Sequence, residues 1–298
     1  QENEDRYRTL FESSHDAILL YGGQPAVFID CNTRALELYG YASKADLLSL
    51  QPADLSPPRQ EDGQDTAELI EGYVQRVLAG ERCRFEWLHC KSDGTVFPAG
   101  IQLSRINLRG QLVIQATVRD IGEIRLARER LEFLAHHDAL TGLPNRVLFN
   151  EHLEQALSLA QREQRGLGLL FIDLDEFKPV NDRHGHAVGD ILLRQVGVRI
   201  RDVLRRSDIV GRIGGDEFMV LLGQVGNPLD AARIAEKVRR ALASPFLIDD
   251  KALSIGSSIG VALFPEHGLD AIELTRHADQ AMYCLLYTSD AADEGLGV

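Results

Sequence analysis

Two carboxylates at the end of an apolar run are candidates for a functional site. Residues 167–174 are almost all apolar, which predicts a buried central strand. Asp173 and Asp175 lie at the end of this run. Residues two apart in a strand point to one face, so both carboxylates should leave the strand on the same side. Taken singly, each acid could equally be a helix cap or a solvated loop residue.

A second acidic pair lies at a predicted hairpin. Gly214 and Gly215 precede Asp216 and Glu217, and strand-like apolar runs flank this stretch on both sides. Gly-Gly tolerates the positive φ of a tight two-residue turn, which predicts a hairpin with an acidic tip. An acidic hairpin tip is common by itself. Beside the acids at the strand end, it predicts a site for a hard cation bound by oxygen ligands.

These acids stand among further spaced motifs. The blocks are Asp138-Ala139-Leu140-Thr141-Gly142-Leu143-Pro144-Asn145-Arg146, Phe171-Ile172-Asp173-Leu174-Asp175-Glu176-Phe177-Lys178, Asn181-Asp182, Gly185-His186, Gly189-Asp190 and Arg212-Ile213-Gly214-Gly215-Asp216-Glu217-Phe218. Together they resemble the GGDEF family of diguanylate cyclases, over roughly Asp138 to Tyr283. The resemblance implies an enzyme that joins two GTP molecules into cyclic di-GMP and releases two pyrophosphates.

The resemblance also implies roles for the acidic residues. Asp173, the backbone carbonyl of Leu174 and Asp216 would hold Mg²⁺ or Mn²⁺ against the triphosphate. Asp216 would also take the proton of the ribose 3′-hydroxyl, and Glu217 would complete the acidic pocket. Lys178 would neutralise charge that develops on the phosphates. Phosphoryl transfer of this kind is mainly positioning and charge neutralisation.

Four further residues match the family's substrate side. Asn181 and Asp190 occupy its guanine-reading positions, where an amide and a carboxylate suit the guanine edge. Their spacing predicts one before and one inside a helix that starts near Asp190. His186 matches a substrate-side position, with a packing role as the alternative, and Phe177 is expected to pack beneath the site.

A regulatory motif and an alternative function also follow from the resemblance. Arg205 and Asp208 fit the family's Arg-x-x-Asp inhibitory motif, which binds the product cyclic di-GMP. Arginine offers a planar fork for phosphate or guanine edges. The alternative to a cyclase is a receptor that binds GTP or cyclic di-GMP without turnover.

The pattern of residues 1–120 predicts a sensor domain that is separate from the domain with the acidic motifs. Two strands, small helices and a three-stranded meander, with a hairpin turn at Asp93-Gly94, resemble a PAS domain. The expected fold class is therefore α+β with α/β: a PAS domain with an antiparallel sheet and short helices, a helical linker at 121–137, and a GGDEF domain at 138–283. The GGDEF domain should have a central mixed sheet flanked by helices, similar to nucleotide-cyclase palms.

The ligand of the PAS domain stays unknown from the sequence. Cys83 superficially resembles the flavin-adduct cysteine of light-sensing relatives, but it opens a predicted strand rather than a helix against a flavin. His89 shares a strand face with Phe85 and Trp87, which favours a packed or half-exposed histidine over a haem ligand.

The linker is expected to form a dimer stalk. Ile124, Ala127, Leu131 and Leu134 fit a and d positions over about two heptads. The alternative is an amphipathic helix that lies on one of its own domains. A cyclase needs two active sites facing one another, which favours a homodimer.

Composition limits the partners and the compartment. The net charge of −13 argues against a nucleic-acid surface. Four cysteines lack metal-ligand or disulfide-framework spacing, which favours a reducing, cytoplasmic compartment. No apolar stretch is long enough to span a membrane, so no membrane contact is expected. The chain begins at Gln1 without an initiator Met, so we expect a fragment that lacks an upstream anchor or sensor.

The last residues depart from the family pattern. Residues 284–298 look like the translation of a sequencing adapter, and we interpret them as a non-native tail. Leu286 stands where the family has a lysine that contacts the triphosphate. We therefore expect poor order beyond about Tyr287 and at most weak cyclase activity.

Overall fold

The computed structural model describes residues 8–22, 27–108 and 110–294, with side chains described as far as residue 283. The chain divides into two compact units, Gln1–Glu129 and Arg130–Val298. The division falls inside helix α5 (Gly122–His136), which corresponds to the predicted linker. None of the helices in the described ranges is long and apolar enough to cross a membrane.

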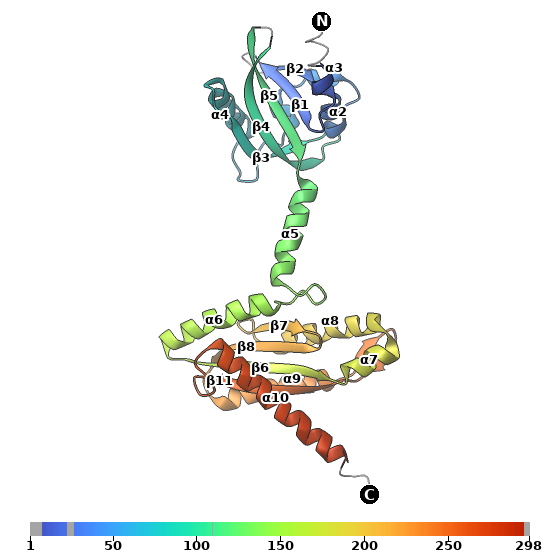
Figure 1. Cartoon of the computed structure of the whole chain (residues 1–298), viewed down its shortest axis with the longest axis vertical. Coiled ribbons are helices and arrows are strands. Elements are labelled where there is room, and N and C mark those ends of the chain that lie inside the picture. Colours follow the sequence, from blue (N-terminus) through green and yellow to red (C-terminus); the bar gives the residue numbers. More distant parts are fainter. Residues whose placement is uncertain (1–7, 23–26, 109, 295–298) are drawn as a thin grey trace. The chain divides into compact units, whose positions relative to one another are not determined.

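The first unit is a five-stranded antiparallel sheet with short helices (Figure 1). The strand order is β2-β1-β5-β4-β3, so the first hairpin joins the later meander through β1 and β5. The elements are β1 (Ala17–Gly22), β2 (Val27–Cys31), α2 (Thr33–Tyr39), α3 (Lys44–Leu48), η1 (Pro52–Leu55), α4 (Thr66–Leu78), β3 (Cys83–Cys90), β4 (Val96–Leu108) and β5 (Gln111–Asp120).

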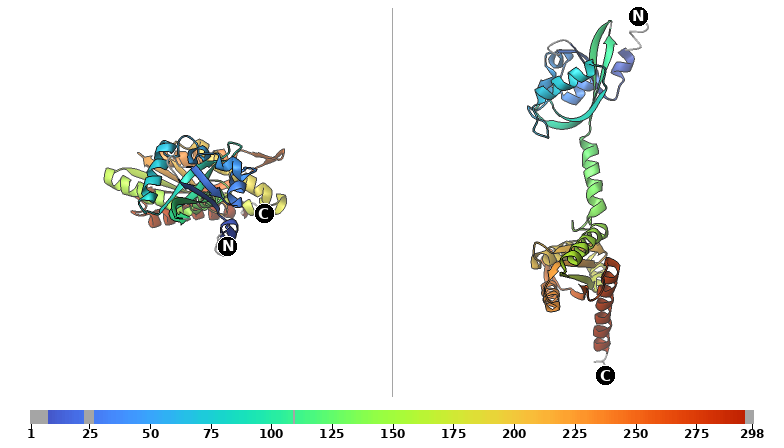
Figure 2. Two further views of the ribbon diagram at one scale, coloured as in Figure 1. Left: turned by 90° about the horizontal axis from the view of Figure 1, so that it is seen from above. Right: turned by 90° about the vertical axis from the view of Figure 1, so that its left-hand side faces the viewer.

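One face of this sheet curves around the helices, as Figure 2 shows. Tyr39, Leu47, Leu55 and Val77 come one each from α2, α3, η1 and α4, and all are buried against the strands. Alternation along the strands places the apolar side chains of β1, β4 and β5 on that same face. The core of the first unit is therefore a layer between the sheet and its helices.

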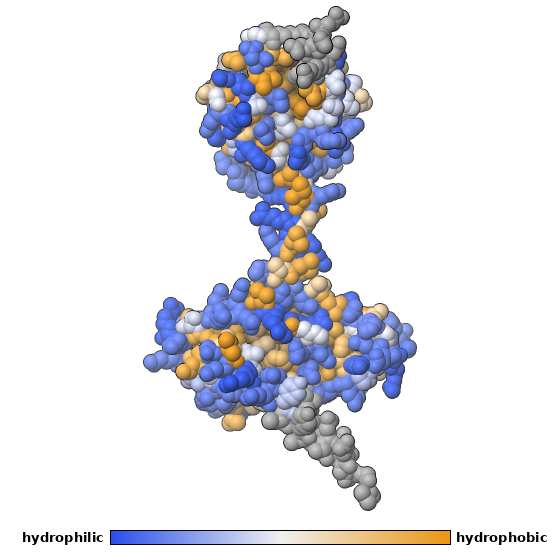
Figure 3. All heavy atoms as spheres, viewed as in Figure 1, coloured by the Kyte–Doolittle hydropathy of each residue, from blue (hydrophilic) through white to orange (hydrophobic). Residues whose placement is uncertain are grey.

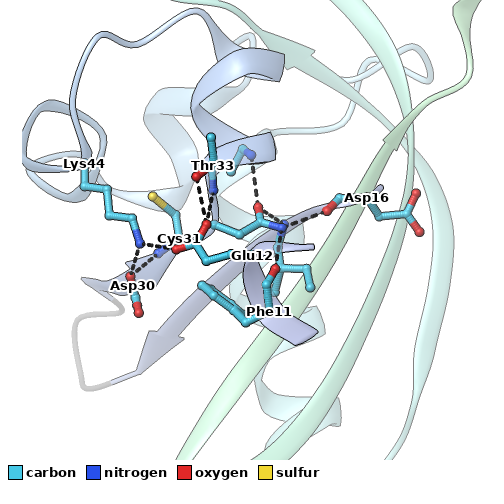
Figure 4. A network of polar contacts seen from close by, with 10 residues as sticks. Phe11, Glu12, Asp16, Asp30, Cys31, Thr33 and Lys44 are labelled. Carbon is cyan, nitrogen blue, oxygen red and sulfur yellow. Dashed lines mark hydrogen bonds and ion pairs between the residues drawn. The ribbon is translucent and has the colours of Figure 1, made fainter. Parts of the chain in front are cut away.

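Asn32 fastens the start of α2 to the first strand. Its Oδ1 accepts hydrogen bonds from the backbone N–H groups of Ile18, at 2.9 Å, and Ala35, at 3.0 Å. Its Nδ2 donates to the carbonyl oxygens of Phe11 and Asp16, both at 3.0 Å (Figure 4). A buried amide is stable only when its donors and acceptor are satisfied, and those of Asn32 are. The residue is structural.

The second unit is a four-stranded sheet with helices on both faces. Its elements are α6 (Arg146–Glu163), β6 (Gly166–Asp175), α7 (Phe177–His184), α8 (His186–Val203), β7 (Ile209–Gly214), β8 (Glu217–Val225), α9 (Pro228–Ala243), β9 (Phe246–Ile248), β10 (Lys251–Leu253), β11 (Gly256–Phe264) and α10 (Ala271–Glu294). The order is β11-β6-β8-β7. Every described neighbour pair in it is antiparallel, so the sheet is not the mixed one that the sequence predicted. The reason is that β8 lies between β6 and β7, so each helical crossover skips one strand.

Two helical layers cover this sheet (Figures 1 and 2). Buried residues of α8 and α9 pack on one face, against Leu170 and Ile172 of β6. Residues of α6 and α10 pack on the other face, against Leu169 and Phe171. A strand covered on both faces must be apolar throughout, which explains the unbroken apolar run before Asp173.

Helix α10 extends further than the sequence suggested. Its backbone is helical from Ala271 to Glu294, which differs from the disorder expected beyond about Tyr287. No glycine or proline interrupts this range, so nothing in it breaks a helix. The side chain of Leu286 lies outside the described residues.

Candidate functional site

The acidic site forms where β6 ends between its two neighbours. Asp173 lies opposite Glu217 of β8 and opposite Ser258 of β11. Asp175 accepts a hydrogen bond from the Ser258 hydroxyl at 2.8 Å. Residues paired across a sheet lie side by side, so the carboxylates of Asp173 and Glu217 are neighbours at the end of β6.

The hairpin turn consists of Gly215 and Asp216, because Gly214 and Glu217 form the last pair of β7 and β8. Gly215 has a φ of 50°, so only one of the two glycines lies in the left-handed region. Arg212 holds the turn: its Nε and Nη2 donate to the carbonyl oxygen of Gly215 at 3.0 and 2.6 Å.

Electrostatic crowding marks the end of β6. Burial, together with the charges of Asp216, Glu217 and Asp175, raises the pKa of Asp173 to about 6. Burial likewise raises the pKa of Glu217, although Arg146, whose Nη2 lies 3.9 Å from Oε2, opposes the shift. A cation bound between these carboxylates would offset their mutual repulsion and stabilise their ionised forms.

A cavity of about 1030 Å³ opens at this edge of the sheet. Asp173, Leu174 and Asp216 line it together with Phe177 and Lys178 of α7, so the structure brings together five of the predicted site residues. Phe177 is buried, as expected of a residue beneath the site, and Lys178 is exposed.

Three cationic or titratable residues on this cavity were missed by the sequence reasoning. Arg183 and His184, from the end of α7, and Lys251, from β10, line its other walls. The α7 pair lies next to the motif Asn181-Asp182, which is the only sequence signal for it. Lys251 has none, because only the folding of β9 and β10 beside the site places it there.

Glu217 faces a different space from Asp216. It lines a groove of about 530 Å³ between α6 and α10, whose other lining residues include Arg146 and Asp279. Asp216 belongs to the turn, whereas Glu217 is the first residue of β8, so the two neighbouring acids line different spaces. The sequence predicted one acidic pocket for Asp216 and Glu217, but in the structure they line two different spaces.

The residues fit a divalent cation that shares its ligands with a substrate. No cluster of three His, Cys, Asp or Glu residues suited to a metal ion occurs in the part of the chain that the structure describes. Mg²⁺ usually takes one or two protein carboxylates and fills its shell with phosphate oxygens and water. Asp173 and Asp216, with the carbonyl of Leu174 beside them, match that kind of donor set.

The guanine-reading candidates lie on α7 and α8, outside the described lining of the cavity. Asn181 precedes α8 and Asp190 lies inside it, as predicted, but Asn181 is itself in α7 and α8 begins at His186 rather than near Asp190. The reason is Gly185, whose φ of 86° breaks the chain into two helices. A β-carbon at Gly189 would overlap the Asn181 amide, so this close approach brings Asn181 next to the residue before Asp190.

The two residues of the predicted inhibitory motif form a tight turn before β7. The Asp208 carboxylate accepts the backbone N–H of Arg205 at 3.1 Å, and the Asp208 N–H donates to the Arg205 carbonyl at 3.0 Å. The Arg205 guanidinium is exposed, and no ion pair occupies it within the described ranges. A guanidinium of this kind is available to an anionic ligand.

The comparison with protein families decides the assignment. The family described as "Diguanylate cyclase, GGDEF domain" matches residues 135–289, which is more than half of the chain. The chain belongs to the GGDEF family. A PAS domain family matches residues 5–71, in the first unit. The sheet, the hairpin and the strand-end acids described above lie within the residues that match the GGDEF domain, and the resemblances of the chain to the two families are confirmed.

Several relatives share the GGDEF domain. Diguanylate cyclase TpbB of Pseudomonas aeruginosa is 47% identical over 150 residues, which cover 50% of this chain and 34% of the relative. The bifunctional diguanylate cyclase/cyclic di-GMP phosphodiesterase MucR of the same species is 44% identical over 176 residues, 59% of this chain and 25% of the relative. A solved GGDEF domain of TpbB aligns with a TM-score of 0.49 at 46% identity and covers 50% of this chain and 87% of that one. The chain thus spans about a quarter to a third of the length of these curated relatives.

Proposed function

We propose that this chain is a diguanylate cyclase that condenses two GTP molecules into cyclic di-GMP and two pyrophosphates. The observation that carries the proposal is the cavity that Asp173, Asp216 and Lys178 line together. Such a set of residues suits a triphosphate whose negative charge is neutralised partly by a metal cation and partly by a lysine. The names of the relatives TpbB and MucR support the same activity.

Each step would join a 3′-oxygen to an α-phosphorus. The 3′-hydroxyl of one nucleotide attacks, the P–O bond to the β-phosphate breaks, and pyrophosphate leaves roughly in line. Asp216, the hairpin carboxylate that lines the cavity, takes the hydroxyl proton. Lys178 neutralises charge on the phosphates, and Asn181 and Asp190 orient the guanine. His186, which is exposed at the start of α8, would lie on the substrate side.

A divalent cation, Mg²⁺ or Mn²⁺, would be held by Asp173, the Leu174 carbonyl and Asp216. When bound, it would supply charge neutralisation for the triphosphate and the departing pyrophosphate. The raised pKa of Asp173, which burial and three neighbouring acids cause, supports a cation at this place.

The active form would be a homodimer formed through α5. Two nucleotides must face one another, which a single cavity does not provide. Helix α5 has no buried residues among those described, and Ile124, Leu131 and Ala127 are exposed on it. Apolar surface follows this helix in Figure 3. Pairing of two such helices would bury that surface.

The activity would be regulated at two places. Arg205 and Asp208 would bind cyclic di-GMP and inhibit the enzyme, and the PAS domain would respond to a signal. Cys31, Cys83 and Cys90 are free thiols, which fits the reducing cytoplasmic compartment we propose.

The deciding experiment supplies GTP and Mg²⁺ and measures cyclic di-GMP and pyrophosphate. We expect product in a two-to-one ratio of pyrophosphate to cyclic di-GMP, and loss of both on chelation of the metal. Asp216→Asn, which keeps shape but removes charge, should lower turnover by orders of magnitude. Asp202→Asn, an exposed acid near the end of α8, is the matched control. Parent-level turnover by the Asp216 variant would refute the assignment.

A receptor without turnover is the second candidate. The observation that favours it is Leu286, which stands where the family resemblance places a triphosphate-binding lysine. A receptor would bind GTP or cyclic di-GMP in calorimetry while releasing no pyrophosphate in the same preparation. That combination, with an intact fold, would replace the cyclase proposal.

A further inference from the structure

The first unit contains a cavity of its own between the sheet and the helices. The space in it that is open to water molecules measures about 60 Å³. None of its fourteen lining residues is Asp, Glu, Lys or Arg. One water needs roughly 10–15 Å³ by this measure, so the cavity holds a few waters or one small ring.

Aromatic rings form one wall of this cavity. Tyr73 of α4 stacks on Phe85 of β3 with ring centroids 3.8 Å apart, and its edge meets Trp87 at 6.1 Å. The Trp87 indole is itself fixed, because its Nε1 donates to the Ser56 hydroxyl at 2.9 Å. Because these rings are already fixed by their neighbours, they lose little conformational entropy when a ligand enters, and this favours binding.

His89 is the one nitrogen-bearing ring on the wall whose hydrogen-bonding is incomplete. Its Nδ1 lies 2.7 Å from the carbonyl oxygen of Leu55. A carbonyl only accepts, so Nδ1 carries the proton and Nε2 is an acceptor. Across the described residues, no group hydrogen-bonds to that Nε2. Burial lowers the pKa of His89 to about 4, so the ring is neutral near pH 7.

We propose that this cavity binds a small uncharged molecule, about one ring in size, that donates one hydrogen bond to His89. The apolar walls exclude an ion, because a charge would lose its hydration without gaining a partner. The space of about 60 Å³ is too small for haem or a flavin, each of which is several times larger than one ring. This binding is independent of the nucleotide chemistry proposed for the second unit.

The chain carries its own reporter for the test. Trp87 lines the cavity and is the only tryptophan in the sequence. The full chain is titrated with phenol, with toluene, which has the ring and no donor, and with benzoate, which is charged. Tryptophan emission should change saturably with phenol. Toluene should bind roughly 3- to 10-fold more weakly, the effect of one hydrogen bond. Benzoate should not bind.

Two variants locate the site. His89→Phe should reduce phenol affinity to that of toluene while toluene affinity stays the same. Ala116→Leu fills the cavity from β5 and should abolish both. Val113→Ile enlarges a buried residue of the same strand outside the cavity lining and should change neither. Should a variant fail to fold, the three probes on the unaltered chain still decide. No saturable change with phenol or toluene, or equal binding of benzoate, overturns the proposal.

Discussion

Arg212 and Asp138 join the acidic hairpin to the turn that follows α5. Arg212 Nη1 lies 2.9 Å from Asp138 Oδ1, and the two side chains are 11% and 23% exposed. Burial alone would raise the pKa of Asp138, but hydrogen bonds from Thr141 and from Arg212 hold it below its usual range. The same guanidinium holds the carbonyl of Gly215, so the turn before Asp216 is fastened to the end of the linker.

Removal of this ion pair should loosen the hairpin. Arg212→Ala deletes charged hydrogen bonds worth roughly 1.5–3 kcal/mol each, so hairpin amides should exchange with solvent at least 10-fold faster. Arg212→Lys should fall between, because lysine lacks the planar fork. Hydrogen exchange of peptides covering 213–219 measures this.

The control for this prediction is Arg233→Ala, on the exposed face of α9. A double variant with Asp138→Asn should lose little more than Arg212→Ala alone, since both remove one interaction. Full additivity of the two changes would show that the residues act separately.

Arg205→Ala should weaken cyclic di-GMP binding by roughly 10- to 100-fold, the effect of one charged hydrogen bond, and leave GTP binding unchanged. Arg206→Ala, the exposed neighbour, is the matched control. Calorimetry with each nucleotide measures both. An unaltered affinity for cyclic di-GMP would rule out a role for Arg205.

If the chain dimerises through α5, substitutions of two equally exposed leucines on this helix should affect the dimer differently. Leu131 and Leu126 are both 68% exposed, but only Leu131 lies at an a position. Leu131→Glu should shift the chain from dimer to monomer in sedimentation and abolish turnover while GTP still binds. Leu126→Glu should leave the dimer intact. Identical behaviour of the two variants would argue against a coiled coil.

His89 predicts acid sensitivity of the first unit. Its pKa falls from 6.5 to about 4 on folding, mainly through burial, so the unfolded chain binds the proton more strongly. Stability should therefore be lost as the pH falls through 6.5 towards 4, by up to roughly 3 kcal/mol. Denaturation followed by Trp87 emission measures it. In His89→Gln this part of the pH dependence should disappear, and its persistence would assign the effect to other groups.

Local features of the fold could be predicted because their causes are local. The small helices of the PAS domain are an example, because α4 (Thr66–Leu78) begins at a cap that its own neighbour Asp65 supplies. The apolar run before Asp173 indicated a covered central strand, and both faces of β6 are covered. The antiparallel direction of the sheet was missed, because it depends on which strand is inserted between two others.

The site was predicted in part for the same reason. Asp173 and Asp216 lie in motifs, so their types and spacing were visible in the sequence. The ion pair of Arg212 with Asp138 spans 74 positions, and no local pattern indicates it. The separation of Glu217 from Asp216 depends on which residue begins β8, and the place of Lys251 depends on β9 and β10.

The position of β6 has a consequence for the order in which the site can form during synthesis. Its two neighbours, β8 and β11, come from residues 217–225 and 256–264, so the central strand is made long before either edge can be closed. Until Phe264 has left the ribosome, one side of β6 remains an unpaired strand edge, which is a template for aggregation. A shortened version of this domain that ends before Gly256 would retain every acidic motif and still lack β11, the strand that pairs with Asp173 and Asp175.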